Sequence, residues 1–181
     1  MPDILSGMQY ISEKHRKRTR KDGHDYARPG WYFVTIVTRY RLPFFGEIVQ
    51  GVNRLNAAGI VVEQAWHDLP ERFPIIRLDA YVVMPNHLHG IIGIRRPTDD
   101  LPVVSLSRIV GAFKSLTTNA YSDGVIERGW EPFEGHLWQR SFHDQIIRSR
   151  SHLDHVRAYI NDNPRNWEAD DDHPGRHPRQ P

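Results

Sequence analysis

Two histidines separated by a single leucine, His87 and His89, are the first candidates for chemistry in this chain. Because successive side chains of a β-strand point to opposite faces, both imidazoles would project from the same face of a strand. Such a pair can chelate one divalent cation, and Gly90 would leave space beside it. The same triplet also occurs on surface hairpins without a metal, and a catalytic metal site normally needs a third protein ligand. The pair therefore predicts a metal site only if the fold brings a further ligand to it.

A segment nearer the C-terminal end, residues 151–164, offers such a ligand. Its apolar residues recur at helical spacing and would pack on the rest of the protein: Leu153, Val156 and Ile160. The adjoining stripe is polar and contains His152, His155, Tyr159 and Asn163. Tyr159 would lie at the border of the buried face, within reach of an open site, and Asn163 could supply an oxygen ligand. Alternatively, Tyr159 only anchors the helix and Asn163 only ends it before Pro164.

The elements that would position these side chains alternate along the chain. Aromatic, β-branched and alternating apolar residues predict four strands, over residues 31–38, 75–84, 87–94 and 138–147. Helical periodicity predicts three helices, over residues 56–69, 105–121 and 151–163, with a loop at 122–136. The order is that of a ferredoxin-like β-α-β-β-α-β unit. We therefore expect an α+β fold, a ferredoxin-like antiparallel sheet with packed helices, plus an extra C-terminal helix that bears Tyr159.

The 181 residues predict one compact domain, at 29–167, with polar segments at both ends. Residues 1–28 form a basic arm, in which residues 14–21 contain six cations in eight positions. Clustered cations neutralise phosphates, so nucleic acid is a candidate partner, although the arm could equally be a solvated segment. Residues 168–181 are rich in Asp, His, Pro and Arg and are predicted to be a disordered tail.

Composition excludes several classes of protein. The chain has no cysteine, which excludes disulfides, thiolate metal sites and cysteine nucleophiles and suits a reducing cytoplasm. It contains neither a signal-peptide pattern nor the roughly 18 consecutive apolar residues of a membrane span. We expect a soluble cytoplasmic protein with no membrane partner and no nucleotide cofactor.

Both chemical segments resemble those of a known family. Residues 85–90 resemble the "HUH" motif of the IS200-like single-tyrosine transposases, two histidines that flank a bulky hydrophobic residue. Tyr159, Asn163 and Pro164 resemble the tyrosine motif of the REP-associated branch, whose members process repetitive extragenic palindromes. Residues 29–35, 113–115 and 137–144 are also similar to this branch. The resemblance extends over roughly residues 10–167 and identifies the chain as a member of this family.

The resemblance implies a metal-dependent transesterase with a divalent cation, Mg²⁺ or Mn²⁺. His87 and His89 would bind the cation, and the residue four positions after the tyrosine, Asn163, would supply a third ligand. Tyr159 would attack a phosphate of single-stranded or hairpin DNA, which leaves a 5′-phosphotyrosine and a free 3′-hydroxyl. That hydroxyl would later rejoin the DNA.

Further residues are candidates for supporting roles. A phenol with a pKa of about 10 needs help to lose its proton, and either His155 or a metal-bound water could provide it. Single-stranded DNA is held by cations and by bases stacked on aromatic rings. The candidate DNA-binding residues are Arg16, Lys17, Arg18, Lys114, Trp138 and Arg140. The alternatives are solvated surface charge and, for Trp138, core packing.

Two other functions fit the same residues. A metal-dependent hydrolase would use water as the nucleophile and would tolerate the substitution Tyr159→Phe. A non-catalytic protein derived from a transposase would bind hairpin DNA without forming a covalent adduct. The sequence also leaves open whether the protein is a monomer or a homodimer that exchanges its tyrosine helices.

Overall fold

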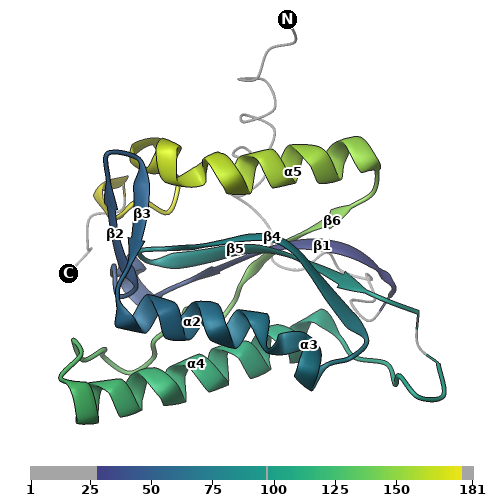
Figure 1. The fold of residues 1–181 in the computed structure, drawn as a ribbon, viewed down its shortest axis with the longest axis horizontal. Helices are drawn as coiled ribbons and strands as arrows, with labels where there is room; N and C mark the ends of the chain where they lie inside the picture. Colours follow the sequence, from purple (N-terminus) through teal and green to yellow (C-terminus); the bar gives the residue numbers. More distant parts are fainter. Residues whose placement is uncertain (1–27, 97, 177–181) are drawn as a thin grey trace, which may run out of the picture.

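The structure, a computed structural model, describes residues 28–96 and 98–176. Four strands form an antiparallel sheet in the order β4-β5-β1-β6 (Figure 1). Their bounds are β1 (Gly30–Val37), β4 (Ile76–Met84), β5 (His87–Ile94) and β6 (His143–Ile147). β5 pairs with β4 on one side and with β1 on the other, so His87 and His89 begin a central strand.

Helices cover both faces of this sheet. In Figure 1, α2 (Ala57–His67), the short α3 (Leu69–Arg72) and α4 (Leu106–Arg128) lie below the sheet, and α5 (Arg150–Asp162) lies above it. The three longer helices begin at Asn56, Ser105 and Ser149, whose side chains each accept a hydrogen bond from a backbone N–H three residues later. The α+β, ferredoxin-like fold with an additional C-terminal helix is confirmed.

Shorter elements complete the end of the sheet at which His87 lies. The hairpin of β2 (Gly46–Val49) and β3 (Val52–Leu55) stands apart from the main sheet. Three 3₁₀ helices are η1 (Arg39–Arg41), η2 (Asn163–Ala169) and η3 (Pro174–Arg176). η2 follows α5 without a break in the sequence. In Figure 1 the chain after α5 turns back toward the sheet.

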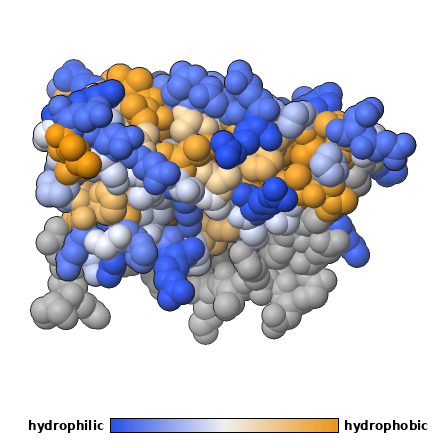
Figure 2. All heavy atoms as spheres, turned by 90° about the horizontal axis from the view of Figure 1, so that it is seen from below, coloured by the Kyte–Doolittle hydropathy of each residue, from blue (hydrophilic) through white to orange (hydrophobic). Residues whose placement is uncertain are grey.

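Two separate apolar clusters hold the layers together. The larger one fills the space between the sheet and helices α2 and α4, with Trp66, Phe113 and Trp138 at its centre. The smaller one lies beneath α5 and consists of Phe33, Ile91, Ile147, Leu153, Val156 and Ile160. The outward surface on the α4 side mixes hydrophilic and hydrophobic residues (Figure 2).

Several element boundaries differ from those predicted. α4 continues into the segment predicted as a loop as far as Arg128, and it is capped by Gly129, which has a left-handed conformation with φ 68°. Position 124, inside the helix, is occupied by glycine, because a Cβ there would meet the Trp130 ring at 2.1 Å. α2 ends at His67, and Pro70 lies in the first turn of α3 rather than stopping a single helix.

The last strand is shorter than predicted, since it begins at His143 and not at residue 138. Trp138 forms only an isolated bridge with Thr38. Between these points, the Lys114 ammonium group donates hydrogen bonds to the carbonyls of Gln139 and Ser141, both at 2.8 Å, and so holds residues 139–141 as a loop.

The predicted disorder does not hold for residues 168–176. Asp170 and Asp172 are each only 7% exposed, and both make hydrogen bonds with residues of the fold. Burying a carboxylate is unfavourable unless donors or cations surround it, and a polar composition does not reveal that such partners exist elsewhere in the chain. The remainder of the predicted tail, 177–181, and the basic arm up to residue 27 lie outside the described residues.

Candidate active site

The two histidines of β5 lie on the face of the sheet that α5 covers. His87 is 0% exposed and His89 is 1% exposed, and their ring centroids are 4.4 Å apart. Leu88 and Ile92 point to the opposite face and join the larger apolar cluster, as the alternation predicts. Gly90 also belongs to that opposite face, where a Cβ would meet the Trp66 ring at 2.3 Å. The glycine therefore makes room for Trp66, and the expectation that it leaves space beside the histidines is wrong.

Each imidazole is oriented by a neighbour that engages its Nδ1. His87 Nδ1 lies 2.8 Å from Asn86 Oδ1, and His89 Nδ1 lies 2.9 Å from Thr35 Oγ1. Thr35 is the cross-strand partner of His89 in the β1–β5 ladder, so the sheet register sets this contact. A contact at Nδ1 leaves Nε2 as the nitrogen that can bind a cation, which is the usual arrangement around metal-binding histidines.

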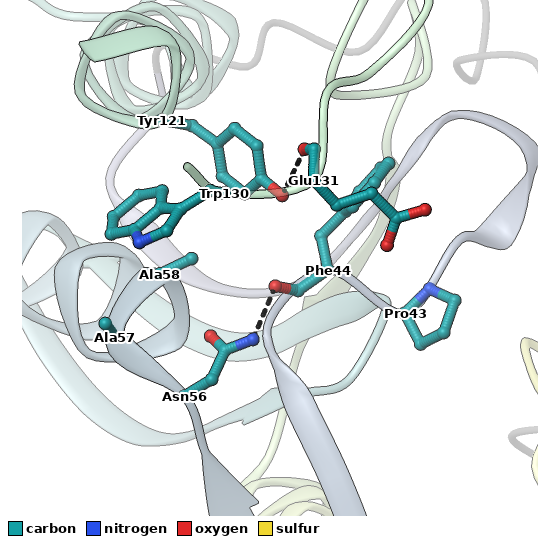
Figure 3. Close-up of a pocket in the computed structure, with 8 residues that line it drawn as sticks. All are labelled: Pro43, Phe44, Asn56, Ala57, Ala58, Tyr121, Trp130 and Glu131. Atoms are coloured by element: carbon teal, nitrogen blue, oxygen red, sulfur yellow. Dashed lines mark hydrogen bonds between the residues drawn. The ribbon is translucent and has the colours of Figure 1, made fainter. Parts of the chain in front are cut away.

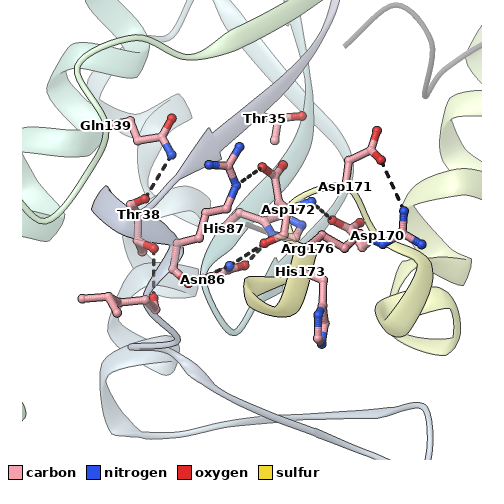
Figure 4. Close-up of polar contacts among 12 residues, drawn as sticks. Thr35, Thr38, Asn86, His87, Gln139, Asp170, Asp171, Asp172, His173 and Arg176 are labelled. Carbon is pink, nitrogen blue, oxygen red and sulfur yellow. Dashed lines mark hydrogen bonds and ion pairs between the residues drawn. The ribbon is translucent and has the colours of Figure 1, made fainter. Parts of the chain in front are cut away.

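Asn86 is itself held from two directions. Its Nδ2 donates to the carbonyls of Arg41, at 3.0 Å, and Asp172, at 2.7 Å. Figure 4 shows Asn86 beside Asp172, in the segment that follows η2. The residue before the first histidine thus joins three parts of the chain that are far apart in sequence.

Tyr159 reaches this pair from α5. Its hydroxyl lies 3.4 Å from His89 Nε2, and its ring packs edge-on against Phe33 with centroids 5.9 Å apart. Burial, followed by the charges of Asp170 and Asp172, raises the pKa of the phenol well above its usual value. Tyr159 is therefore protonated at neutral pH, and a cation beside it would favour the phenolate.

Asp170 is a site residue that the sequence did not predict. Its carboxylate lies within 4.8 Å of the ligand nitrogens of both His87 and His89, and the three residues form a group that can hold a metal ion. Burial raises the pKa of Asp170, but the neighbouring His89 and His87 and the hydrogen bond from Asn163 outweigh this and hold it well below its usual range. The only sequence signal is the acidic run 170–172 shortly after the tyrosine motif.

The site has the protonation state that a divalent cation requires. Burial, and then the neighbouring His87, lower the pKa of His89 to about 4, so its imidazole is neutral at pH 7. A neutral imidazole beside an ionised carboxylate is a ligand set for Zn²⁺, Mn²⁺ or Mg²⁺. The donor set therefore fits a divalent cation.

Asn163 lies at the edge of the same group and is 2% exposed. Its Nδ2 donates to Asp170 Oδ2 at 2.7 Å. Its Oδ1 is buried and accepts no hydrogen bond from the described part of the chain. An acceptor in that condition can accept a cation, so Asn163 remains a candidate ligand beside Asp170.

The other predicted site residues are not gathered at this point. His155 is exposed on α5, while the ring nitrogen within 3.5 Å of the Tyr159 hydroxyl is that of His89. Trp138 is only 4% exposed and donates its Nε1–H to Thr117, so the prediction that bases stack on it is wrong and the core-packing alternative holds. Lys114 is partly buried and its ammonium group is bonded to backbone carbonyls.

Four predicted DNA-binding residues remain predictions. Arg140 is exposed on the loop that Lys114 holds. Arg16, Lys17 and Arg18 lie outside the described residues.

A cavity of about 230 Å³ lies away from this group, on the side of the sheet that carries α2 and α4. Aromatic rings of Phe44, Tyr121 and Trp130 form its walls, with Glu131 beside them (Figure 3). The Tyr121 hydroxyl donates to the Glu131 carbonyl, and burial, then the Glu131 charge, raise the pKa of Tyr121 to about 12. This cavity contains no residue of the histidine–tyrosine group.

Comparison with known proteins identifies the class. The sequence model of the IS200-like transposases matches residues 31–163, which is most of the chain, so the chain belongs to this transposase family. An uncharacterised protein of Haemophilus influenzae is 32% identical over 171 residues, covering 86% of this chain and 92% of that protein.

A solved structure has the same fold. It is that of a REP-associated tyrosine transposase bound to a REP hairpin, with a TM-score of 0.56 and 21% identity, and the match covers 81% of this chain and 73% of that chain.

None of the helices described is long and apolar enough to cross a membrane.

Proposed function

We propose that the protein cleaves and rejoins single-stranded DNA through Tyr159, with a divalent cation held by His87 and His89. One observation carries the proposal: the Tyr159 hydroxyl lies 3.4 Å from His89 Nε2, on the face to which both imidazoles point. Membership of the IS200-like transposase family supports the same reaction class.

The chemistry is a transfer of one phosphodiester between two oxygens. The Tyr159 oxygen attacks phosphorus, the bond from phosphorus to the 3′ oxygen breaks, and the DNA is left with a 5′-phosphotyrosine and a 3′-hydroxyl. A divalent cation at the site supplies charge that stabilises the phosphate in the transition state. Attack by a 3′-hydroxyl on the phosphotyrosine reverses the step and releases the tyrosine, so joining needs no nucleotide cofactor.

The protein's own residues would prepare this step. Thr35 and Asn86 orient the two imidazoles, and Phe33 supports the Tyr159 ring from its edge. His87 and His89 would hold the cation together with an oxygen of Asn163 or Asp170. Measuring Mn²⁺ binding by calorimetry separates the last two: a greater loss in Asp170→Asn assigns Asp170, and a greater loss in Asn163→Ala assigns Asn163.

The acceptor of the phenol proton has two candidates, His155 and water at the cation. His155 lies one helical turn before Tyr159 on the exposed side of α5. If it is the base, His155→Gln lowers the cleavage rate and removes an ionisation from the pH profile of that rate. An unchanged rate and profile assign the proton to water.

The proposed substrate is hairpin DNA with a single-stranded flank. The structural relative was solved with a REP hairpin, and Arg140 together with Arg16, Lys17 and Arg18 would neutralise phosphates. Palindromes that flank the gene of this protein are therefore the first DNA to use.

The test looks for protein covalently attached to labelled DNA on denaturing gels, with Mn²⁺ or Mg²⁺ present. Tyr159→Phe and His87→Ala should each reduce the adduct at least about a thousandfold. Tyr40→Phe, at an exposed tyrosine on η1, is the matched control and should retain activity.

The alternatives give different results in the same assay. Cleavage that survives in Tyr159→Phe would favour a hydrolase that uses water. Tight hairpin binding without any adduct, under either metal, would indicate a DNA-binding protein that has kept the fold of a transposase.

A further inference from the structure

The tyrosine helix has polar contacts on both sides of its apolar stripe. Val156 and Ile160 point into the cluster beneath α5. At 100° per residue, Tyr159 and Arg157 flank that stripe on opposite sides. Tyr159 reaches toward His89, and Arg157 reaches toward β4 at the edge of the sheet.

Arg157 is bonded to Asp79 of β4 through two parallel hydrogen bonds. Nε donates to Oδ1 and Nη2 donates to Oδ2, both at 2.7 Å. This two-point geometry fixes orientation as well as distance, which a single contact does not. The Arg157 side chain is 33% exposed and that of Asp79 is 17% exposed, so water screens the pair only in part. The hydrogen bond from Arg157 lowers the pKa of Asp79, despite an opposing effect of burial.

A bulge in β4 brings Asp79 to the side of the helix. The pairing of β4 with β5 is interrupted between Leu78 and Tyr81, both of which pack on the larger cluster on the opposite face. In a regular strand, Asp79 and Ala80 would point to opposite faces. Here Ala80 packs on the cluster beneath α5, and Asp79 bonds to α5 as well. Bulges of this kind redirect side chains next to active sites.

The Asp79 carboxylate also holds the bulge itself. Its Oδ1 accepts a hydrogen bond from the backbone N–H of Ala80 at 2.8 Å. One carboxylate therefore links the irregular point of β4 to the helix that bears the nucleophile. Apolar packing is not directional, so the stripe of α5 alone would allow small rotations and shifts of the helix.

We propose that Asp79 and Arg157 are positioning residues, which set the rotation of α5 on this chain's own sheet and thereby place the Tyr159 hydroxyl at the histidine pair. The inference rests on the proposed function, and it adds residues distant from the reacting atoms. A nucleophile must be held within about 0.5 Å of its productive position. A rotation that breaks the contact with β4 on one side of the helix also moves the phenol on the other side.

The expected effect falls on the rate of the chemical step. Asp79→Asn, Arg157→Gln and the double variant should each lower the single-turnover rate of adduct formation by about 10- to 100-fold. The double variant should be no slower than the single variants, because the two residues act as one contact. The affinity for hairpin DNA should stay at the wild-type value. Arg157→Lys keeps the charge but loses the two-point geometry, so it should also be slow.

The matched control is Arg150→Gln. Arg150 is on the same helix, its side chain is 81% exposed, and the ion pair that it makes among the described residues is with Asp154 of that helix, not with the sheet. It should react at the wild-type rate. A structural readout accompanies the kinetics: hydrogen exchange of the α5 backbone should become faster in the Asp79 and Arg157 variants and stay unchanged in Arg150→Gln.

The two readouts separate failure of this inference from failure of the proposed function. If the wild-type protein forms no adduct, the proposed function fails, and hydrogen exchange still tests the contact. Wild-type exchange of α5 in Asp79→Asn and Arg157→Lys would overturn the inference. Slow adduct formation accompanied by an equal loss of DNA affinity would overturn it as well, because positioning affects the chemical step alone.

Discussion

The face of the sheet that carries α2 and α4 and the face that carries α5 are packed with different kinds of residue. On the first face, Trp66, Phe113 and Trp138 form a continuous aromatic core. On the second face, the small cluster around Val156 and Ile160 adjoins buried polar groups, among them His87, His89, Asn163 and Asp170. The large apolar face can provide stability, and the other face can therefore hold ionisable groups that cost stability and perform chemistry.

Truncating the aromatic core should have the largest effect on stability. Phe113→Ala is expected to lower the free energy of unfolding by about 3–5 kcal/mol, because it leaves a cavity between Trp66 and Trp138. Tyr159→Phe, on the other face, should change it by less than about 1 kcal/mol while abolishing the adduct. Urea unfolding followed by tryptophan fluorescence measures both. Equal losses in the two variants would contradict the division between the faces.

The polar face should make the stability of the metal-free protein depend on pH. The folded pKa of His89 is about 4 and its ordinary value is 6.5, so the unfolded chain binds more protons between these values. Stability should therefore be complete above about pH 6.5 and fall as the pH drops toward 4, by at most about 3 kcal/mol.

Unfolding in EDTA between pH 7 and pH 4.5 measures this dependence. His89→Gln should flatten the profile, and His136→Gln, at an exposed histidine, should leave it unchanged. A profile that does not change in His89→Gln would show that other groups cause the dependence.

A methyl group at Gly90 tests the strand that separates the two faces. Gly90→Ala should cost about 1–3 kcal/mol, because the new Cβ would lie 2.3 Å from the Trp66 ring. Gly111→Ala is the control, since its Cβ would meet nothing within 4 Å inside α4. It should stabilise the protein by about 0.5–1 kcal/mol. Equal changes in the two variants would show that the close approach of Trp66 is not what requires glycine.

The smallest expected effect concerns the orientation of one imidazole. Thr35→Val keeps the shape of the side chain but removes the hydroxyl beside His89 Nδ1, so the affinity for Mn²⁺ should fall about tenfold. Thr117→Val removes a buried hydroxyl on the other face, where it accepts from Trp138 Nε1. That variant should lose about 1 kcal/mol of stability and keep its metal affinity. Calorimetric titration with Mn²⁺ distinguishes the two results.

The core of the site was predictable because its pattern is local. Alternation along residues 87–94 places His87 and His89 on one face whatever the rest of the chain does. Helical spacing likewise puts Leu153, Val156 and Ile160 on one stripe with Tyr159 beside it. The same periodicities predicted the order of strands and helices, and hence the ferredoxin-like fold.

Other site features depend on partners that the sequence does not place. Trp138 and Lys114 could each have contacted DNA, and they pack inside the fold because Phe113 and the carbonyls of residues 139–141 meet them there. Trp130 packs against Gly124 and covers the part of α4 that the sequence did not predict to be helical.

The sequence by itself determined which residues could perform the chemistry, since residue type and strand or helix periodicity act over a few neighbouring positions. The tertiary structure decided which oxygen donors join them and how the nucleophile is aimed. The buried carboxylate of Asp170 lies beside His89, which belongs to the distant strand β5, and beside Asn163, at the start of η2. Asp79 meets Arg157 because a bulge shifts the alternation of β4 by one residue. The burial of a charge and the shifted side-chain alternation at a bulge depend on the assembled fold, so they cannot be predicted from the local spacing of residues.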